Sequence, residues 1–121
     1  MNEVWQDCLF PVMLGSGTVC HACVRQMGRH LGVESTVLTG RRALTLRFLP
    51  RVHLVSAPST LPDEILLNIL TDINDESGLR VPLLVLCDEE YVGFVERNRK
   101  ALEARFVLRR GEELLRGETV L

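Results

Sequence analysis

The sequence predicts an α/β domain in which a mostly parallel sheet lies between layers of helices. Short apolar runs of strand type alternate along the chain with longer stretches whose apolar residues recur at helical spacing. The run Val81–Cys87 (VPLLVLC) is apolar throughout, which is typical of a central strand buried on both faces. A length of 121 residues favours a single domain, residues 1–121, with one core.

The first part of the chain is predicted to form a strand, a glycine turn and a helix. Residues 1–10 have mixed character and are assigned to an N-terminal arm. The short apolar run Pro11–Leu14 indicates a strand, which ends where the glycines of Gly15–Gly17 break the pattern. An apolar stripe then predicts a helix over Thr18–Leu31, and Gly32 is placed to end it in a left-handed cap.

Two further strands are predicted before the middle of the chain. Glu34–Leu38 alternates weakly and indicates the second strand, and Thr39–Arg42 then indicates a turn. The stretch Ala43–Leu49 fits either a strand or one helical turn. Val52–Val55 indicates the third strand.

The second half of the chain is predicted to contain two longer helices and the remaining strands. An apolar stripe predicts a helix over Pro62–Glu76, and a second helical pattern covers Asp88–Arg105, directly after the buried fourth strand. Phe106–Leu108 indicates a fifth strand, and residues 109–121 form a C-terminal tail with one helical turn. From this order of elements we expect a three-layer, Rossmann-like sandwich of four to five strands in the order 3-2-1-4-5.

Three predicted loops meet at one edge of this sheet. They are Gly15–Thr18, Thr39–Arg42 and Cys87–Glu89, each of which follows a strand. Ligands of parallel sheets bind at the carboxyl ends of the strands, close to the point where the strand order reverses. We therefore expect the ligand site at these loops.

The glycine turn is the first candidate for binding an anion. A strand, a glycine turn and a helix place the N–H groups of Gly15 and Gly17 at a positive helix end, where the Ser16 and Thr18 hydroxyls could add donors. Arg41, in the neighbouring loop, could supply charge with bidentate geometry. The alternative is a tight turn in which Ser16 or Thr18 caps the helix and the arginine is solvated.

Asp88 and Glu89 are candidates for binding a substrate amine at the same edge, because they follow the buried strand directly. Their alternative role is structural. Aspartate is a preferred N-cap, and acidic residues in the first turn of a helix stabilise its positive end.

Cys20 and Cys23 form a C-x-x-C pattern near the start of the first predicted helix. Such a pair can act in redox chemistry when a helix N-terminus lowers the pKa of a thiol. Both cysteines lie on the apolar stripe of that helix, however, which favours buried thiols in the core. A zinc site is the third interpretation, although a second nearby pair of ligands is missing.

Charge and composition exclude several classes of function. The net charge of −2 gives no support for a nucleic-acid partner. Acidic residues near the N-terminus speak against a secretory signal, and no apolar run is long enough to span a membrane. We therefore expect a cytoplasmic protein with reduced cysteines. The first 60 residues carry six arginines against three acidic residues, which fits either a basic rim for an anion or differently solvated faces.

Two long stretches carry motifs in a distinctive order. Val12–Val33 contains a strand, a glycine turn, a helix with Arg25, Gly28, Arg29 and Gly32, and a return, and Pro82–Leu108 contains a strand, Asp-Glu, N-R-x-x-L and F-x-L. These stretches resemble the N-terminal pre-ATP-grasp domain of ATP-grasp carboxylate–amine ligases, a group that includes relatives of carbamoyl-phosphate synthase. Arg47-Phe48 with Val52–Val55 is more weakly similar to that family's S-R-Y segment and third strand. In the second stretch the matching residues are Asp88, Glu89, Asn98, Arg99, Leu102 and Phe106.

The resemblance implies the substrate-side domain of an ATP-dependent carboxylate–amine or carboxylate–thiol ligase, which is not catalytic by itself. Its ligand would be a small carboxylate or another anion, and it would need no cofactor of its own. ATP and Mg²⁺ would be held by an ATP-grasp domain in cis, because Lys100 is the only lysine and the sequence ends at Leu121. Two alternatives remain: a free-standing module that binds a small anion or a nucleotide, and, ranked third, a C-x-x-C redox or metal protein. A homodimer is also left open.

Overall fold

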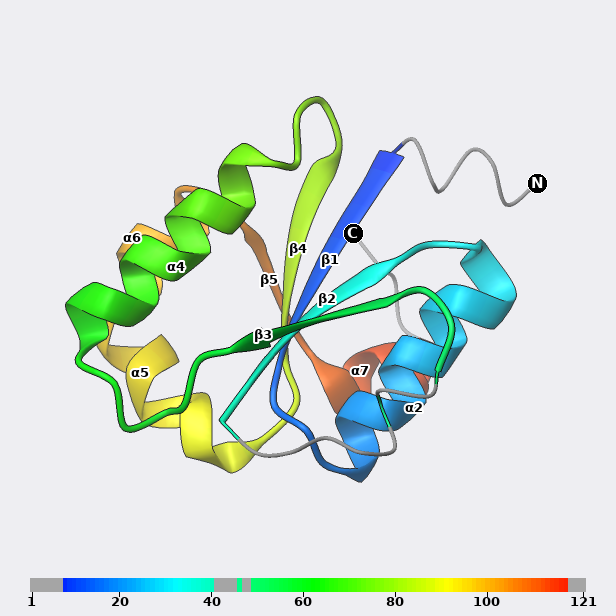
Figure 1. Ribbon diagram of the computed structural model, residues 1–121, viewed down its shortest axis with the longest axis horizontal. Coiled ribbons are helices and arrows are strands. Elements are labelled where there is room, and N and C mark those ends of the chain that lie inside the picture. The colour runs from blue at the N-terminus through cyan, green and yellow to red at the C-terminus, as the bar shows by residue number, and fades with distance from the viewer. Residues whose placement is uncertain (1–7, 41–45, 47–48, 118–121) are drawn as a thin grey trace.

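The computed structural model describes residues 8–40, 46 and 49–117 (Figure 1). The described residues form a five-stranded sheet in the order β3-β2-β1-β4-β5, in which every neighbouring pair is parallel. The predicted fold class and strand order are therefore confirmed. The strands are β1 Leu9–Leu14, β2 Ser35–Thr39, β3 Val52–Ser56, β4 Val81–Leu86 and β5 Val107–Arg110.

Helices cover both faces of the sheet. Figure 1 shows α2 and α7 on one face and α4, α5 and α6 on the other. The described helical segments are α2 Thr18–Gln26, η1 Met27–Leu31, α4 Asp63–Asp75, η2 Glu89–Tyr91, α5 Val92–Arg97, α6 Arg99–Glu103 and α7 Gly111–Leu115.

The sheet divides the apolar core into two halves. Successive residues of a strand point to opposite faces. In β1, Phe10, Val12 and Leu14 pack with side chains of α4, α5 and α6, whereas Leu9 and Met13 pack with side chains of α2 and α7. Burial on both faces explains why the central strands are apolar throughout instead of alternating.

The N-terminal arm is shorter than predicted, because β1 begins at Leu9 and not at Pro11. Leu9 and Phe10 pair in register with the first two residues of β4, and both are buried. The predicted C-terminal tail is also partly regular structure, since β5 extends to Arg110 and α7 follows directly. In both places the pairing with β4 extends the strand beyond what local patterning indicates.

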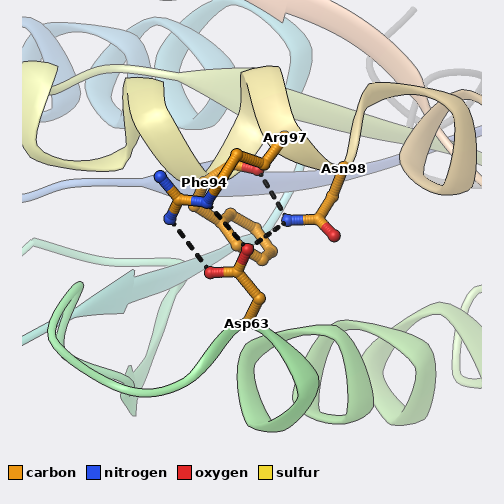
Figure 2. A network of polar contacts seen from close by, with 4 residues as sticks. All are labelled: Asp63, Phe94, Arg97 and Asn98. Carbon is orange, nitrogen blue, oxygen red and sulfur yellow. Dashed lines mark hydrogen bonds and ion pairs between the residues drawn. The ribbon is translucent and has the colours of Figure 1, made fainter.

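The helix predicted over Asp88–Arg105 is divided into η2, α5 and α6. Asn98, with φ −120°, lies between α5 and α6. Its side-chain amide donates to the Phe94 carbonyl at 2.8 Å and to Oδ2 of Asp63 at 2.9 Å (Figure 2). The Phe94 carbonyl also accepts the backbone N–H of Asn98 at 3.1 Å, so Asn98 joins the last turn of α5 through both its backbone and its side chain, and α6 begins at the next residue, Arg99.

The first helix covers its predicted range in two forms, α2 and the π-helical segment η1. Gly32 has φ 67° and ψ 26°, so the predicted left-handed cap is confirmed. Within the undecided stretch Ala43–Leu49, Leu46 is described and is buried against the α2 face of the sheet. Leu46 is helical and its carbonyl accepts a hydrogen bond from the Leu49 N–H at 3.1 Å, which supports the helical turn at that position, whereas Arg41 and the Arg47-Phe48 segment lie outside the described residues.

Candidate functional site

The carboxyl ends of three strands lie side by side in the sheet. Leu14, the last residue of β1, pairs with Leu86, the last residue of β4, and Leu86 pairs with Arg110, the last residue of β5. Because the strands are parallel, the segments that follow them leave from the same edge of the sheet. The glycine turn, Asp88 and the start of α7 are thus neighbours in space, although they are far apart in sequence.

The carboxylate of Asp88 fills the glycine turn. The Ser16 N–H donates to Oδ2 of Asp88 at 2.8 Å. A Cβ atom added at Gly15, where φ is +135°, would lie 2.6 Å from Cγ of Asp88, and one added at Gly17 would lie 2.9 Å from Oδ1. Both glycines therefore leave room for the carboxylate, and the anion that contacts this turn is one of the protein's own side chains.

The other predicted site residues of the two loops lie apart from this contact. Thr18 is the exposed first residue of α2, and Glu89 is exposed in η2. Gly17 is the N-cap of α2, without a side-chain cap from Ser16 or Thr18. Asp88 is the N-cap of η2 but makes no side-chain cap hydrogen bond there, because its carboxylate reaches the glycine turn instead. Arg41 lies outside the described residues.

Tyr91 anchors the loop that carries Asp88. Its hydroxyl donates to the Ala57 carbonyl at 2.7 Å, which ties η2 to the segment that follows β3. The side chain is fully buried. Burial, followed by the negative charges of Glu90 and Asp88, raises the pKa of Tyr91 to about 12. The phenol is therefore a neutral donor that fixes the position of this loop.

A cavity of about 120 Å³ opens at the same edge and is lined by Leu14, the residue before the glycine turn. The register of β4 and β5 forms the floor of this cavity. Leu84 pairs with Leu108, and two residues further along, on the same face of the sheet, Leu86 pairs with Arg110. An aliphatic floor with charged groups around it is the usual composition of a small-molecule site. The cavity is lined by Leu14, Leu84, Leu86, Val95 and Leu108, and by the charged Arg99, Arg109, Arg110 and Glu113.

The charged side chains of this cavity differ in whether they have hydrogen-bond or ion-pair partners within the protein. Arg99 lies 3.4 Å from Glu96 and 3.6 Å from Glu103, in half-exposed ion pairs within the helical segment. Arg109 donates to the Leu108 carbonyl at 2.7 Å. Within the described part of the chain, Arg110 is exposed and neither it nor Glu113 has a hydrogen-bond or ion-pair partner. A ligand would thus meet one arginine and one glutamate whose charges are available.

Hydrogen bonds join the start of α4 to the break between α5 and α6, and we call this contact the clamp. The helix that follows the break, α6, begins at Arg99. Asp63, the first residue of α4, accepts hydrogen bonds from Arg97 at 2.9 and 3.0 Å and from Asn98 at 2.9 Å (Figure 2). These donors, Arg97 first and Asn98 second, lower the pKa of Asp63 to about 2. The clamp holds the break after α5 in place and so positions Arg99 at the cavity.

The C-x-x-C cysteines are buried, as the apolar stripe predicts, and Cys87 from the end of β4 lies against them. The Cys23 thiol donates to the Gly111 carbonyl at 3.5 Å. Hydrogen bonds with Cys20 and Cys23, together with burial, raise the pKa of Cys87 well above its usual value, and the contact with Cys87 lowers that of Cys23. All four cysteines are free thiols. The three buried thiols therefore form part of the packing between α2, β4 and α7.

Sequence reasoning did not place Arg99, Arg109, Arg110 or Glu113 in the site. Arg109 and Arg110 lie in the predicted C-terminal tail, although consecutive arginines directly after an apolar strand are a usable signal for its carboxyl end. Glu113 offers no signal in the sequence, because its place beside the cavity depends on how α7 packs.

Among residues 8–40, 46 and 49–117, no three His, Cys, Asp or Glu side chains are arranged to hold a metal ion. The helices of the same described residues are too short or too polar to cross a membrane. Comparisons with models of known protein families, with curated proteins and with solved structures find no match.

Proposed function

We propose that this chain binds a small anionic molecule, a carboxylate or a phosphate, in the cavity at the carboxyl edge of its sheet. One observation carries the proposal: an aliphatic cavity bordered by arginines lies where β1, β4 and β5 end. Planar guanidinium groups bind carboxylates and phosphates through paired hydrogen bonds. This site differs from the glycine turn that the sequence favours.

The contact between Asp88 and the glycine turn supports the cavity over the turn as the ligand site. The Ser16 N–H is already used by the Asp88 carboxylate, and Asp88 leaves no free space next to Gly15. A second anion at that point would be repelled by the first. Arg110, in contrast, is exposed at the cavity and has no partner among the described residues.

The sequence resemblance suggests where such a binding domain acts. We propose that it forms the substrate side of an ATP-dependent carboxylate–amine or carboxylate–thiol ligase in the cytoplasm, without catalytic groups of its own. The resemblance assigns ATP and Mg²⁺ to another domain of such a ligase. Both would be held by an ATP-grasp domain in cis. The four free cysteines support a reducing compartment.

Thermal unfolding with small anions tests the binding proposal. The probes are 4-methylpentanoate and inorganic phosphate, and the variants are Arg110→Glu and Arg105→Glu. Arg105 is a matched control, because it is also exposed but does not line the cavity. At ten times its dissociation constant a ligand stabilises the protein by about 1.4 kcal/mol, which raises the Tm by roughly 5 °C.

We expect at least one probe to raise the Tm of the unaltered protein and of Arg105→Glu, but not of Arg110→Glu. Backbone amide signals of Leu86 and Arg110 should shift on binding. The proposal is wrong if neither probe stabilises the protein, if Arg110→Glu responds as the unaltered protein does, or if the shifted signals centre on Ser16.

A further inference from the structure

The cavity at the carboxyl edge offers opposite charges to one ligand. Arg110 and Glu113 both line it, and neither has an ion-pair partner among the described residues. They are three residues apart, at the start of α7, yet they do not pair with each other. A ligand that carries only a carboxylate would use the arginine and would leave the glutamate unpaired or repelled.

We propose that the ligand of this cavity is a free α-amino acid with a branched aliphatic side chain. This inference rests on the proposed function, since it names the class of anion that the cavity receives. Arg110 binds the α-carboxylate, Glu113 accepts hydrogen bonds from the α-ammonium group, and the leucine floor contacts the side chain.

Arg99 is a second donor for the carboxylate. Its ion pairs with Glu96 and Glu103 are half-exposed, with distances of 3.4 and 3.6 Å. Exposed pairs of this kind contribute little to stability, so that exchanging one of them for a bound carboxylate costs little. The break at Asn98 places Arg99 at the first position of α6, next to the cavity.

The size of the cavity selects the side chain. Its volume is about 120 Å³. An apolar protein cavity of about 150 Å³ accommodates benzene. The branched four-carbon group of leucine and the three-carbon group of valine are smaller than benzene and match this volume, whereas the side chain of phenylalanine is larger than benzene and should bind more weakly. Each buried methylene group contributes about fourfold to affinity, so leucine should bind more than tenfold more tightly than alanine.

Calorimetric titration of the purified chain with matched probes tests the inference. The probes are L-leucine, L-phenylalanine, L-alanine, 4-methylpentanoate, which is leucine without its amine, and 3-methylbutylamine, which is leucine without its carboxylate. We expect leucine to bind about tenfold more tightly than 4-methylpentanoate, because a charged hydrogen-bond partner is added. Phenylalanine, alanine and the amine should bind at least tenfold more weakly than leucine.

The variant Glu113→Gln should remove the preference for leucine over 4-methylpentanoate. Glu112→Gln is the matched control, because Glu112 is the neighbouring residue of α7, is exposed and does not line the cavity. That variant should keep the preference. The probe series on the unaltered protein decides the question even if a variant unfolds.

Two failures are distinguishable in this experiment. If 4-methylpentanoate binds as tightly as leucine, or if Glu113→Gln keeps the preference, the amino-acid inference is overturned while the anion-binding proposal stands. If neither leucine nor 4-methylpentanoate binds, the inference and the carboxylate arm of the proposed function fall together. Equal binding of phenylalanine and leucine also overturns the inference, because the cavity would not limit the side chain.

Discussion

Replacing Gly15 with alanine tests whether the Asp88 carboxylate is seated in the glycine turn. The new Cβ atom would lie 2.6 Å from Cγ of Asp88 and 2.8 Å from its Oδ2. Real Cβ atoms do not tolerate such contacts, so the carboxylate must move and its hydrogen bond to the Ser16 N–H must lengthen or break. Alanine would also have to adopt φ +135°, which L-residues rarely occupy.

These two effects set the expected magnitude. Backbone strain at such a φ costs about 1–3 kcal/mol. Loss of a charge-assisted hydrogen bond or overpacking by one methyl group adds about 2 kcal/mol. The free energy of unfolding should therefore fall by about 3–5 kcal/mol, a large part of the roughly 5–15 kcal/mol that is typical of a domain.

Urea unfolding followed by circular dichroism measures this change in a double-mutant cycle. Asp88→Ala removes the side chain that alanine at position 15 would meet. In that background Gly15→Ala should cost only the backbone strain, so the two changes should be non-additive by about 2 kcal/mol. Gly78→Ala is the matched control, because Gly78 also has positive φ, +61°, but has no neighbouring atom within 4 Å of its Cβ position. It should cost about 1–2 kcal/mol.

The reasoning is refuted if Gly15→Ala costs no more than Gly78→Ala. It is also refuted if the effects of Gly15→Ala and Asp88→Ala add without any interaction. Either result would mean that the carboxylate does not occupy the turn in solution, and the glycine turn would again be the leading site for an external anion.

Two further predictions follow from the groups with shifted pKa values. Asp63 has a folded-state pKa lowered to about 2, so its clamp stabilises the protein above the ordinary carboxyl pKa and is lost as the pH falls toward 2. Asp63→Asn should therefore lower the Tm at neutral pH and lose this effect near pH 2. The control Asp72→Asn, an exposed change on the same helix, should alter the Tm little at either pH. A Tm difference between Asp63→Asn and the unaltered protein that does not depend on pH would contradict this prediction. Tyr91 is the only tyrosine, and its folded-state pKa is raised to about 12. Its protonated form stabilises the fold below about pH 10, and this contribution is lost as the pH rises toward 12. Near-ultraviolet absorbance should thus show little tyrosinate at pH 10.5 in the native state, in contrast to the protein in urea. Ionisation of the native protein near pH 10 would disprove the burial argument.

The fold class was predictable because the burial of each segment gives a pattern of apolar residues that can be recognised within that segment. Val81–Cys87 is uniformly apolar, the stripe over Pro62–Glu76 has helical spacing, and Gly32 lies at the expected left-handed cap. Each of these signals depends on neighbouring residues alone. The ends of elements were less accurate where a distant partner decides them. Pairing with β4 extends β1 to Leu9. The contact between Asn98 and Asp63 lies at the break that divides the predicted helix into α5 and α6.

The candidate site was predictable only as an edge of the sheet. Gly15, Ser16, Gly17 and Asp88 do meet there, as the parallel order of strands requires. Their relationship to one another was not visible, because the sequence does not show that Asp88 turns away from its own helix and into a loop 72 residues earlier in the chain.

By itself, the sequence of this protein determined the α/β class, the parallel order of the sheet and the edge at which loops gather, because periodicity and apolar runs report the burial of each segment. Only the tertiary structure decided which charges face an open cavity. Arg99 reaches it through the break at Asn98, and Arg110 through its register with Leu86. Glu113 reaches it through the packing of α7. Such placements depend on contacts between segments that are distant in the chain, and local sequence carries no record of them.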